Sequence, residues 1–555
     1  MTKRVDIYWW LLPIITGLGA GVAASGINIL VYYSWETFYG DALKTPTLFF
    51  VFPFTGLVLS YFLVHLLAWY RTPKSSFHMI LEIFHMTPTG MMPREALVKT
   101  ASGIATSIFG GSAGPEGPST VISGGFSTWL NKVMKIKMES SKALMIGVAA
   151  GFSASFKTPL TGLLFALELP YRRDLEKEPF IEAAIASSTA YLVSAALGAP
   201  SLLPNLQLDV ASAPLTWLPI AMAFGLATGG FVFLFTGAYG VCERLAKQVV
   251  ARGGYPLMLL LGGILLGAIG YVVPQAVGPG YQMVPLLMGG SAMMLGAVLL
   301  LRTFSTSVTM TFGGTGGLFL PTLLIGGAWG GVVGTMLVPS MTPVFVLMGM
   351  AAFSSGVHKM MLTPIIFMAE VFGPHTIIPI ILATVVCFFV SGTSSFYPIQ
   401  PATKVSQEEL ALERFYYKVA RGKPKELEKL TARDIATRNP ISLRADMSIR
   451  EAMDAFGKTS FRLLPVVDAE RTVIGYVTLE DLAFLSKTAL DKSLSAAELR
   501  APLVFREEER IMRVIEEMIG REEDHCFIVD ADDRLTGIVS TIDVTRLLMR
   551  YYTHA

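Results

Sequence analysis

Long apolar segments follow one another over the first 400 residues, and short amphipathic patterns replace them in the remainder of the chain. About 20 apolar residues span the hydrocarbon core of a bilayer as a helix. Shorter apolar pieces that are broken by glycine are typical of transporters with discontinuous helices around a midplane site. The predicted spans are 8–33, 47–70, 215–241, 256–274, 283–301 and 375–392; the broken pieces are 101–113, 119–131, 145–156, 159–170, 321–338, 343–356 and 361–371.

The distribution of charge divides the chain in two. Only 15% of the residues are charged, and 51 of the 86 Asp, Glu, Lys and Arg side chains lie in 401–555. This predicts a membrane domain over 1–400, a linker over 401–430 and a soluble tail. The first apolar run is too long for a signal-peptide core, so we expect it to be retained as a membrane helix. The net charge of +2 gives no reason to expect a nucleic-acid partner.

A glycine- and proline-rich break at 109–118, Phe-Gly-Gly-Ser-Ala-Gly-Pro-Glu-Gly-Pro, carries a single carboxylate, Glu116. An ionisable residue at membrane depth is costly, which makes Glu116 a candidate functional residue. The break also aims backbone N–H groups and the positive end of a helix dipole at an anion. The alternative is that Glu116 only caps the following helix, where an acid is favoured.

The membrane segment repeats itself. Residues 149–169 align without a gap on 351–371, and 109–119 align on 312–322 at almost the same offset. The duplication suggests two halves, inverted relative to each other, that meet near the bilayer midplane. Glu116 would then lie with the backbone of Leu318 and Phe319. Among the matched pairs are Lys157/Lys359, Glu168/Glu370, Glu116/Phe319 and Pro118/Pro321.

The soluble tail contains a second repeat. Residues 463–481 and 525–543 align at an offset of 62, and each predicts a strand, a turn, a second strand and a helix. An amphipathic helix, 448–456 or 510–518, precedes each copy. Both copies place a hydroxyl residue three positions before an aspartate. Each hydroxyl either caps the next helix or belongs to a site where the aspartate binds a ribose; the residues are Thr478, Asp481, Ser540 and Asp543.

These motifs resemble those of the CLC family of chloride channels and chloride/proton exchangers, and the tail is similar to a tandem pair of CBS domains. The family's G-[KR]-E-G-P signature corresponds to Gly114–Pro118, with Pro115 in place of the base, and G-x-F-x-P is intact at Gly317–Pro321. Tyr397 matches the pore tyrosine. The resemblance implies an all-α polytopic membrane protein with two inverted repeats of broken helices. It also implies a cytosolic α/β CBS pair, with copies at 431–490 and 491–555.

Two departures from the family pattern limit what is expected of the site. The G-S-G-I-P signature falls on 74–78, where only Ser75 is kept. Lys74 either adds positive charge near the entrance or extends to the membrane interface, and His78 is interpreted as structural. The internal proton-transfer glutamate of the exchangers is replaced by Leu169. Glu168 lies about 100° away around a helix, and we expect it to bond a helix end.

The resemblance implies an anion site formed by Ser75, Gly317, Leu318, Phe319 and Tyr397, with Glu116 as its gate. We expect chloride transport that is channel-like or loosely proton-coupled; the alternatives are a strongly coupled antiporter and a CBS-regulated cation transporter. An enzyme is not expected, because no nucleophile–base pair or metal-ligand spacing occurs. No cofactor is expected in the membrane domain, and an adenine nucleotide is the candidate ligand of the CBS pair. A homodimer in a bacterial or archaeal plasma membrane, with a cytoplasmic tail, is implied.

Overall fold

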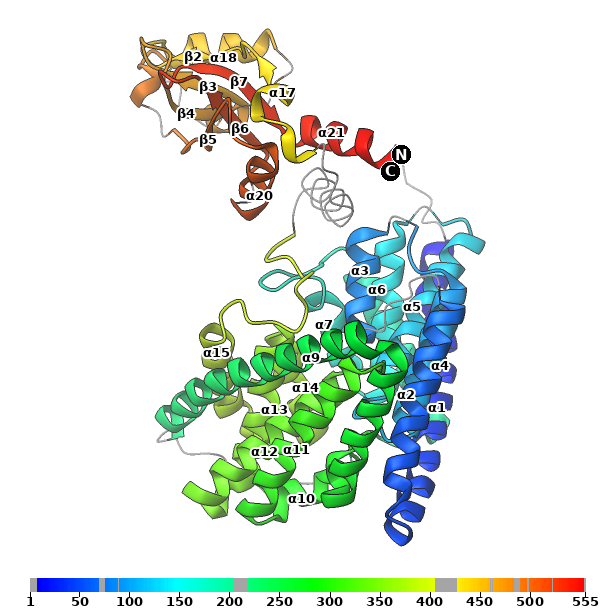
Figure 1. Ribbon diagram of the computed structural model, residues 1–555. Coiled ribbons are helices and arrows are strands. Elements are labelled where there is room, and N and C mark those ends of the chain that lie inside the picture. Colours follow the sequence, from blue (N-terminus) through cyan, green and yellow to red (C-terminus); the bar gives the residue numbers. More distant parts are fainter. Residues whose placement is uncertain are drawn as a thin grey trace. The chain divides into compact units, whose positions relative to one another are not determined.

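The computed structural model describes residues 7–68, 75–87, 89–136, 138–203, 217–404, 427–459, 461, 463–483, 490–496, 499–521 and 523–553. The chain forms two compact units, Met1–Lys404 and Val405–Ala555. The first unit is built of helices and the second of strands and helices (Figure 1).

The first unit is a bundle of α-helices. Among the described residues, six helices are long and apolar enough to cross a membrane, and several others are shorter, as expected for broken spans. The helices are α1 (Ile7–Lys44), α2 (Leu48–Leu67), α3 (Ser76–Met86), α4 (Pro93–Ile108), α5 (Glu116–Val133), α6 (Ser140–Phe156), α7 (Pro159–Glu168), α8 (Phe180–Ala196), α9 (Leu218–Val272), α10 (Met283–Gly289), α11 (Ala292–Thr311), α12 (Phe319–Leu337), α13 (Thr342–His358), α14 (Leu362–Phe372) and α15 (Ile377–Val390).

The helix boundaries differ from the sequence prediction over 283–301 and in two unpredicted helices. The predicted spans 215–241 and 256–274 are the two parts of α9, which meet at a kink at Gly254, whose φ of 72° needs a residue without a Cβ. The predicted span 283–301 is wrong as one helix, because the chain breaks at Gly290 between α10 and α11. Helices α3 and α8 were not predicted.

The repeat has a clear structural counterpart, since α4 to α7 correspond in order to α11 to α14. Gly114 and Gly317 occupy equivalent positions and form an antiparallel bridge. Lys157 and Lys359 are also equivalent, and both adopt the left-handed conformation at a helix C-terminus, with φ of 59° and 57°. Equivalent residues that pair antiparallel are related by an approximate two-fold axis. The predicted fold of two inverted repeats of broken helices is confirmed.

The second unit contains two small sheets with helices beside them. One sheet has the order β1-β7-β6-β5, and the other has the order β2-β3-β4. In each copy the repeated segment forms an antiparallel pair, β3 with β4 and β6 with β7, as predicted. The strands are β1 (Thr437–Arg438), β2 (Leu443–Arg444), β3 (Leu463–Val467), β4 (Val473–Thr478), β5 (Val504–Arg506), β6 (His525–Val529) and β7 (Leu535–Ser540); the α-helices are α17 (Ala432–Ile435), α18 (Ile449–Gly457), α19 (Leu479–Ala483), α20 (Ile511–Arg521) and α21 (Thr541–Thr553).

Candidate functional site

The two glycine-rich breaks meet inside the first unit. Gly114 and Gly317 exchange two backbone hydrogen bonds, each 3.0 Å long. Helix α5 begins two residues after the first glycine, and α12 begins two residues after the second. The positive ends of two helix dipoles therefore lie close together in a buried place, an arrangement that favours a negative charge.

The Glu116 side chain places its carboxylate at this point. It is fully buried, and its Oε1 accepts a hydrogen bond of 3.1 Å from the backbone N–H of Leu320. The backbone of Phe319 also hydrogen-bonds the carboxylate. We expected Leu318 and Phe319 to supply the amides of an anion site, and the amides that meet the carboxylate are those of Phe319 and Leu320.

Glycine is required on both sides of this carboxylate. A Cβ at Gly114 would lie 1.8 Å from Oε2 of Glu116, and one at Gly317 would lie 2.3 Å from Oε1. Both distances are shorter than any non-bonded contact, so a side chain at either position would displace the carboxyl group. Oε2 has no hydrogen-bond partner among the described residues. One oxygen is thus bound at the start of α12, and no described residue donates to the other.

Arg302 of α11 supplies a buried positive charge near this carboxylate. Its guanidinium donates to the carbonyl oxygens of Val277, at 3.1 Å, and Pro279, at 2.9 Å. Arg302 and Glu116 interact electrostatically. Arg302 was not predicted because it directly follows an apolar segment and resembled the end of a span. The sequence did contain a signal for this residue, because a charged side chain next to an apolar segment is a candidate functional residue.

Ser75 and Tyr397 come together, as the family motifs implied, and they belong to a longer polar chain. Ser75 caps α3, accepts a 3.3 Å bond from the backbone N–H of His78 and hydrogen-bonds the Tyr397 hydroxyl. The Tyr397 hydroxyl lies 3.0 Å from Nδ1 of His358. Nε2 of His358 lies 2.8 Å from Oγ1 of Thr322. The place of His358 beside Tyr397 was not predicted, because a lone histidine has no ligand spacing to mark it.

Leu169 is buried, and its carbonyl accepts a 2.8 Å bond from the side chain of Gln400. Its apolar side chain stands where the family's internal carboxylate is expected. Glu168 bonds the first amides of α14, a helix-end role that the sequence predicted. The ring centroid of His78 lies 6.5 Å from that of Tyr397. Lys74 lies outside the described residues.

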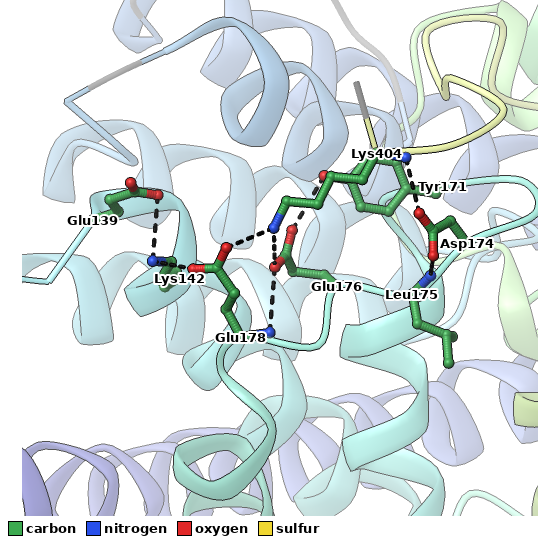
Figure 2. A network of polar contacts seen from close by, with 8 residues as sticks. All are labelled: Glu139, Lys142, Tyr171, Asp174, Leu175, Glu176, Glu178 and Lys404. Atoms are coloured by element: carbon green, nitrogen blue, oxygen red, sulfur yellow. Dashed lines mark hydrogen bonds and ion pairs between the residues drawn. The ribbon is translucent and has the colours of Figure 1, made fainter. Parts of the chain in front are cut away.

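A polar network ties the loop after α7 to the segment that follows Tyr397 (Figure 2). Nζ of Lys404 bonds Glu176 at 2.9 Å and Glu178 at 2.8 Å. The backbone N–H of Lys404 donates to Asp174 at 3.1 Å. Lys142 pairs with Glu178 from the other side. Hydrogen bonds from Lys142 and Lys404 lower the pKa of Glu178 to about 2. We call these residues and Glu139, Tyr171 and Leu175 the Lys404 network.

The two candidate nucleotide sites in the second unit differ. The carboxylate of Asp481 accepts two bonds from Arg500, of 2.9 and 2.7 Å. It also accepts a bond from the backbone N–H of Thr478. These bonds lower the pKa of Asp481 to about 2, with the side-chain bond from Arg500 the largest cause. Ser540 and Asp543 instead line a cavity of about 330 Å³. Other residues that line it are Thr437, Ile441, Asp524 and Arg546.

In both copies the hydroxyl residue caps the helix that contains the aspartate: the Thr478 and Ser540 hydroxyls accept from the backbone N–H groups of Asp481 and Asp543. Asp543 accepts bonds from the backbone N–H of Ser540 at 3.0 Å and from its hydroxyl at 2.6 Å. Helix capping therefore accounts for the hydroxyl and the aspartate in both copies, and Ser540 and Asp543 in addition line the cavity. Among the described residues, no group of three or more His, Cys, Asp or Glu side chains could hold a metal ion.

The geometry defines a class of protein before any comparison: a polytopic membrane protein whose inverted halves bury a polar, amide-lined site between broken helices. Comparison with known families then identifies the particular one. The family described as voltage gated chloride channel matches residues 56–392, and CBS domains match 432–487 and 496–550. The chain belongs to this channel family, whose members transport anions and are not enzymes.

Two curated relatives are similar to much of this chain. A putative chloride channel protein of Ralstonia nicotianae is 26% identical over 62% of this chain and 82% of its own length. An uncharacterized protein of Methanocaldococcus jannaschii is 24% identical over 69% of this chain and 93% of its own length.

Solved structures share the fold. A CLC-type fluoride/proton antiporter has a TM-score of 0.62 at 21% identity, over 73% of this chain and 100% of its own. A slow cyanobacterial Cl⁻/H⁺ antiporter has a TM-score of 0.61 at 18% identity, over 69% of this chain and 93% of its own. A eukaryotic CLC transporter has a TM-score of 0.60 at 16% identity, over 97% of this chain and 99% of its own.

Proposed function

We propose that this protein moves chloride across the membrane through the site between α5 and α12, and that Glu116 is its gate. The observation that carries the proposal is the position of the Glu116 carboxylate, whose Oε1 is bound by the first amides of α12. A carboxylate and a chloride ion are both monovalent anions that accept N–H bonds. They would compete for the same donors, so the bound carboxylate closes the path that chloride would use.

Opening follows from the same competition. A protonated Glu116 no longer carries the charge that the helix ends stabilise, and chloride at high concentration displaces the carboxylate from the amides of Phe319 and Leu320. Gating should therefore depend on both pH and chloride concentration. The Ser75 and Tyr397 hydroxyls would form the inner part of the anion path.

The side chain at Leu169 favours weak coupling to protons. Leucine cannot hold a proton, and Glu168, the adjacent carboxylate, is committed to the amides of Leu362 and Thr363. We therefore place the protein among channels or loosely coupled exchangers. A strongly coupled chloride/proton antiporter is the second candidate, because structural relatives carry that description.

The remaining assignments complete the proposal. We place the CBS pair in the cytoplasm of a bacterial or archaeal cell, where an adenine nucleotide in the cavity beside Ser540 and Asp543 modulates transport. The functional unit is a homodimer with one pore per subunit. A cation transporter would be expected to face its site with several carboxylates, and Glu116 is accompanied instead by the buried cation Arg302.

Anion efflux from liposomes that contain the full-length protein tests the proposal. We expect chloride efflux that rises as the pH falls, and a Glu116→Gln variant whose efflux is faster and depends less on pH than that of the wild type. Unchanged pH dependence in this variant would overturn the gate assignment, and efflux of potassium with no anion efflux would favour the cation transporter.

Two further measurements in the same liposomes distinguish the mechanisms. Uphill proton movement driven by a chloride gradient would identify a coupled exchanger, whereas a channel-like protein would let chloride move down its own gradient without moving protons. Parallel assays with fluoride and chloride show which anion is preferred, a relevant comparison because one structural relative is a fluoride/proton antiporter.

A further inference from the structure

At His358 the two halves differ in chemistry beside the inner site. Its equivalent in the first half is Phe156, one residue before the matched Lys157. Both side chains lie in the core, and His358 is fully buried at the end of α13. The imidazole stacks on the Tyr397 ring, with centroids 5.6 Å apart and planes 26° apart. A buried imidazole in place of a phenyl ring adds one proton-binding atom to an otherwise apolar position.

The hydrogen bonds around His358 determine which ring nitrogen carries its proton. The hydroxyl of Thr322 donates to the carbonyl oxygen of Phe319 at 2.8 Å, so its oxygen is left to accept from Nε2 of His358. The backbone of Leu318 also hydrogen-bonds the imidazole. Reversing the Thr322 hydroxyl would leave two acceptor oxygens in contact without a proton between them. Nε2 is therefore the protonated nitrogen of the neutral ring, and Nδ1 is an acceptor.

This protonation state of His358 fixes the direction of the hydrogen bond from the Tyr397 hydroxyl. A neutral His358 can only accept at Nδ1, so the Tyr397 hydroxyl donates its single proton to the imidazole over 3.0 Å. The Ser75 hydroxyl in turn hydrogen-bonds the Tyr397 oxygen. The chain runs in one direction, from Ser75 through Tyr397, His358 and Thr322 to a carbonyl oxygen. An anion at the inner site needs hydrogen-bond donors. The Tyr397 hydroxyl cannot donate to it, because its single proton is bonded to Nδ1 of His358.

We propose that His358 takes up a proton together with the anion that binds at Ser75 and Tyr397. In the imidazolium ion both ring nitrogens carry protons, so Nδ1 donates to the Tyr397 oxygen. The phenol then turns its own proton to the anion. The imidazolium also places a positive charge one side chain away from the bound anion. Proton and anion binding are thereby linked, and each strengthens the other.

Other titratable and charged groups lie near this chain of hydrogen bonds, and the test must distinguish them from His358. Glu116, on α5, interacts electrostatically with Tyr397 and is the second group whose protonation favours an anion. Lys359, the next residue on α13, directs its Nζ to Ser391 at 2.7 Å. His78, on α3, is a second imidazole near the chain, with its ring centroid 6.5 Å from that of Tyr397. The test therefore removes the proton site of Glu116 first and treats His78 as a control.

The inference rests on the proposed function, since it concerns the anion site of that pathway. The test is isothermal titration of chloride into the full-length Glu116→Gln protein in detergent, in two buffers of equal pH but different ionisation enthalpy. The difference between the two heats measures protons taken up per chloride bound. We expect proton uptake that approaches one proton per chloride at acidic pH, where the apparent Kd should rise with increasing pH by up to about tenfold per unit.

Three variants in the Glu116→Gln background locate the proton. With His358→Phe, which copies the residue of the other half, and with His358→Gln, which keeps a donor and an acceptor but does not titrate, we expect chloride binding without proton uptake. With His78→Gln we expect uptake to persist. Chloride binding without proton uptake in the Glu116→Gln parent, or uptake that persists in His358→Gln, would overturn the inference but not the proposed function. Absence of chloride binding together with absence of anion efflux would overturn both.

Discussion

Glu168 and Glu370 each cap the helix that carries the other. Glu168, at the end of α7, accepts bonds from the amides of Leu362 at 2.8 Å and Thr363 at 2.6 Å, at the start of α14. Glu370, on α14, accepts from the amides of Leu160 at 2.9 Å and Thr161 at 2.8 Å, at the start of α7. The two reciprocal caps join α7 and α14, which are equivalent helices of the two halves.

The first prediction follows from this exchange. Glu168 is 6% exposed and Glu370 is exposed, so water can replace the lost bonds only at the second position. Replacing Glu168 by Gln removes the negative charge that the amides of Met361, Leu362 and Thr363 bond, and should destabilise the protein by about 2–3 kcal/mol. Glu370→Gln should cost less. Thermal unfolding of the purified variants measures both.

The Glu168→Gln variant also distinguishes a structural role of Glu168 from a role in proton transfer. If Glu168 only caps α14, the folded Glu168→Gln protein should keep the pH dependence of anion efflux. A loss of that dependence without a loss of stability would instead make Glu168 a proton carrier.

A second prediction concerns the glycine against the gate. In a Gly114→Ala variant the new Cβ would meet only the Glu116 carboxyl group among its nearest neighbours, with 1.8 Å to Oε2. The carboxylate is the movable partner, so it should leave the α12 amides. Chloride efflux at neutral pH should rise several-fold and its pH dependence should weaken. Gly230→Ala, where a Cβ meets nothing within 4 Å, is the control and should leave efflux unchanged.

Much of this arrangement was predictable because repetition and backbone chemistry leave marks in the sequence. Glycine-rich breaks at matched positions indicated that Glu116 lies at the start of α12. Helix α8 was missed because its Ser, Thr and Ala side chains lower its hydropathy. Those hydroxyls bond neighbouring helices, as Ser194 does to the carbonyl of Ala154 at 2.8 Å. His358 was missed because a lone histidine has no spacing to mark it, although the contrast with Phe156 was visible in the aligned repeat.

The Lys404 network gives a pH prediction. The pKa of Glu178 is lowered to about 2 by its bonds to Lys142 and Lys404, and the pKa of Asp174 is lowered by the backbone N–H groups of Leu175 and Lys404. Lowered carboxylate pKa values stabilise the folded state above the unfolded pKa, and that stability is lost as the pH falls through the folded value. The network should be intact at neutral pH and weaken between about pH 4.5 and about pH 2.

Lys404→Met tests this. Because Lys404 and Glu178 are partly exposed, the loss at pH 7 should be about 1 kcal/mol or less. The gap in melting temperature between wild type and variant should narrow as the pH is lowered from 5 to 3. Lys247→Met, which breaks an exposed pair with Glu243 on α9, should give a smaller loss. A gap that widens on acidification would contradict the assignment.

The last prediction separates the two CBS copies by the state of their aspartates. Asp481 is held by the guanidinium of Arg500, so a nucleotide would have to break a two-bond ion pair to reach it. Asp543 caps its helix and also lines the cavity with Arg546, whose positive charge suits a phosphate. Titration of AMP and ATP into the full-length protein should therefore show one site per chain. Asp543→Ala should weaken binding by tenfold or more, and Asp481→Ala should leave it within about twofold, because that carboxylate is already committed. Equal loss in both variants would assign the ligand to both copies, and no measurable binding to the wild-type chain would leave the two aspartates as helix caps alone.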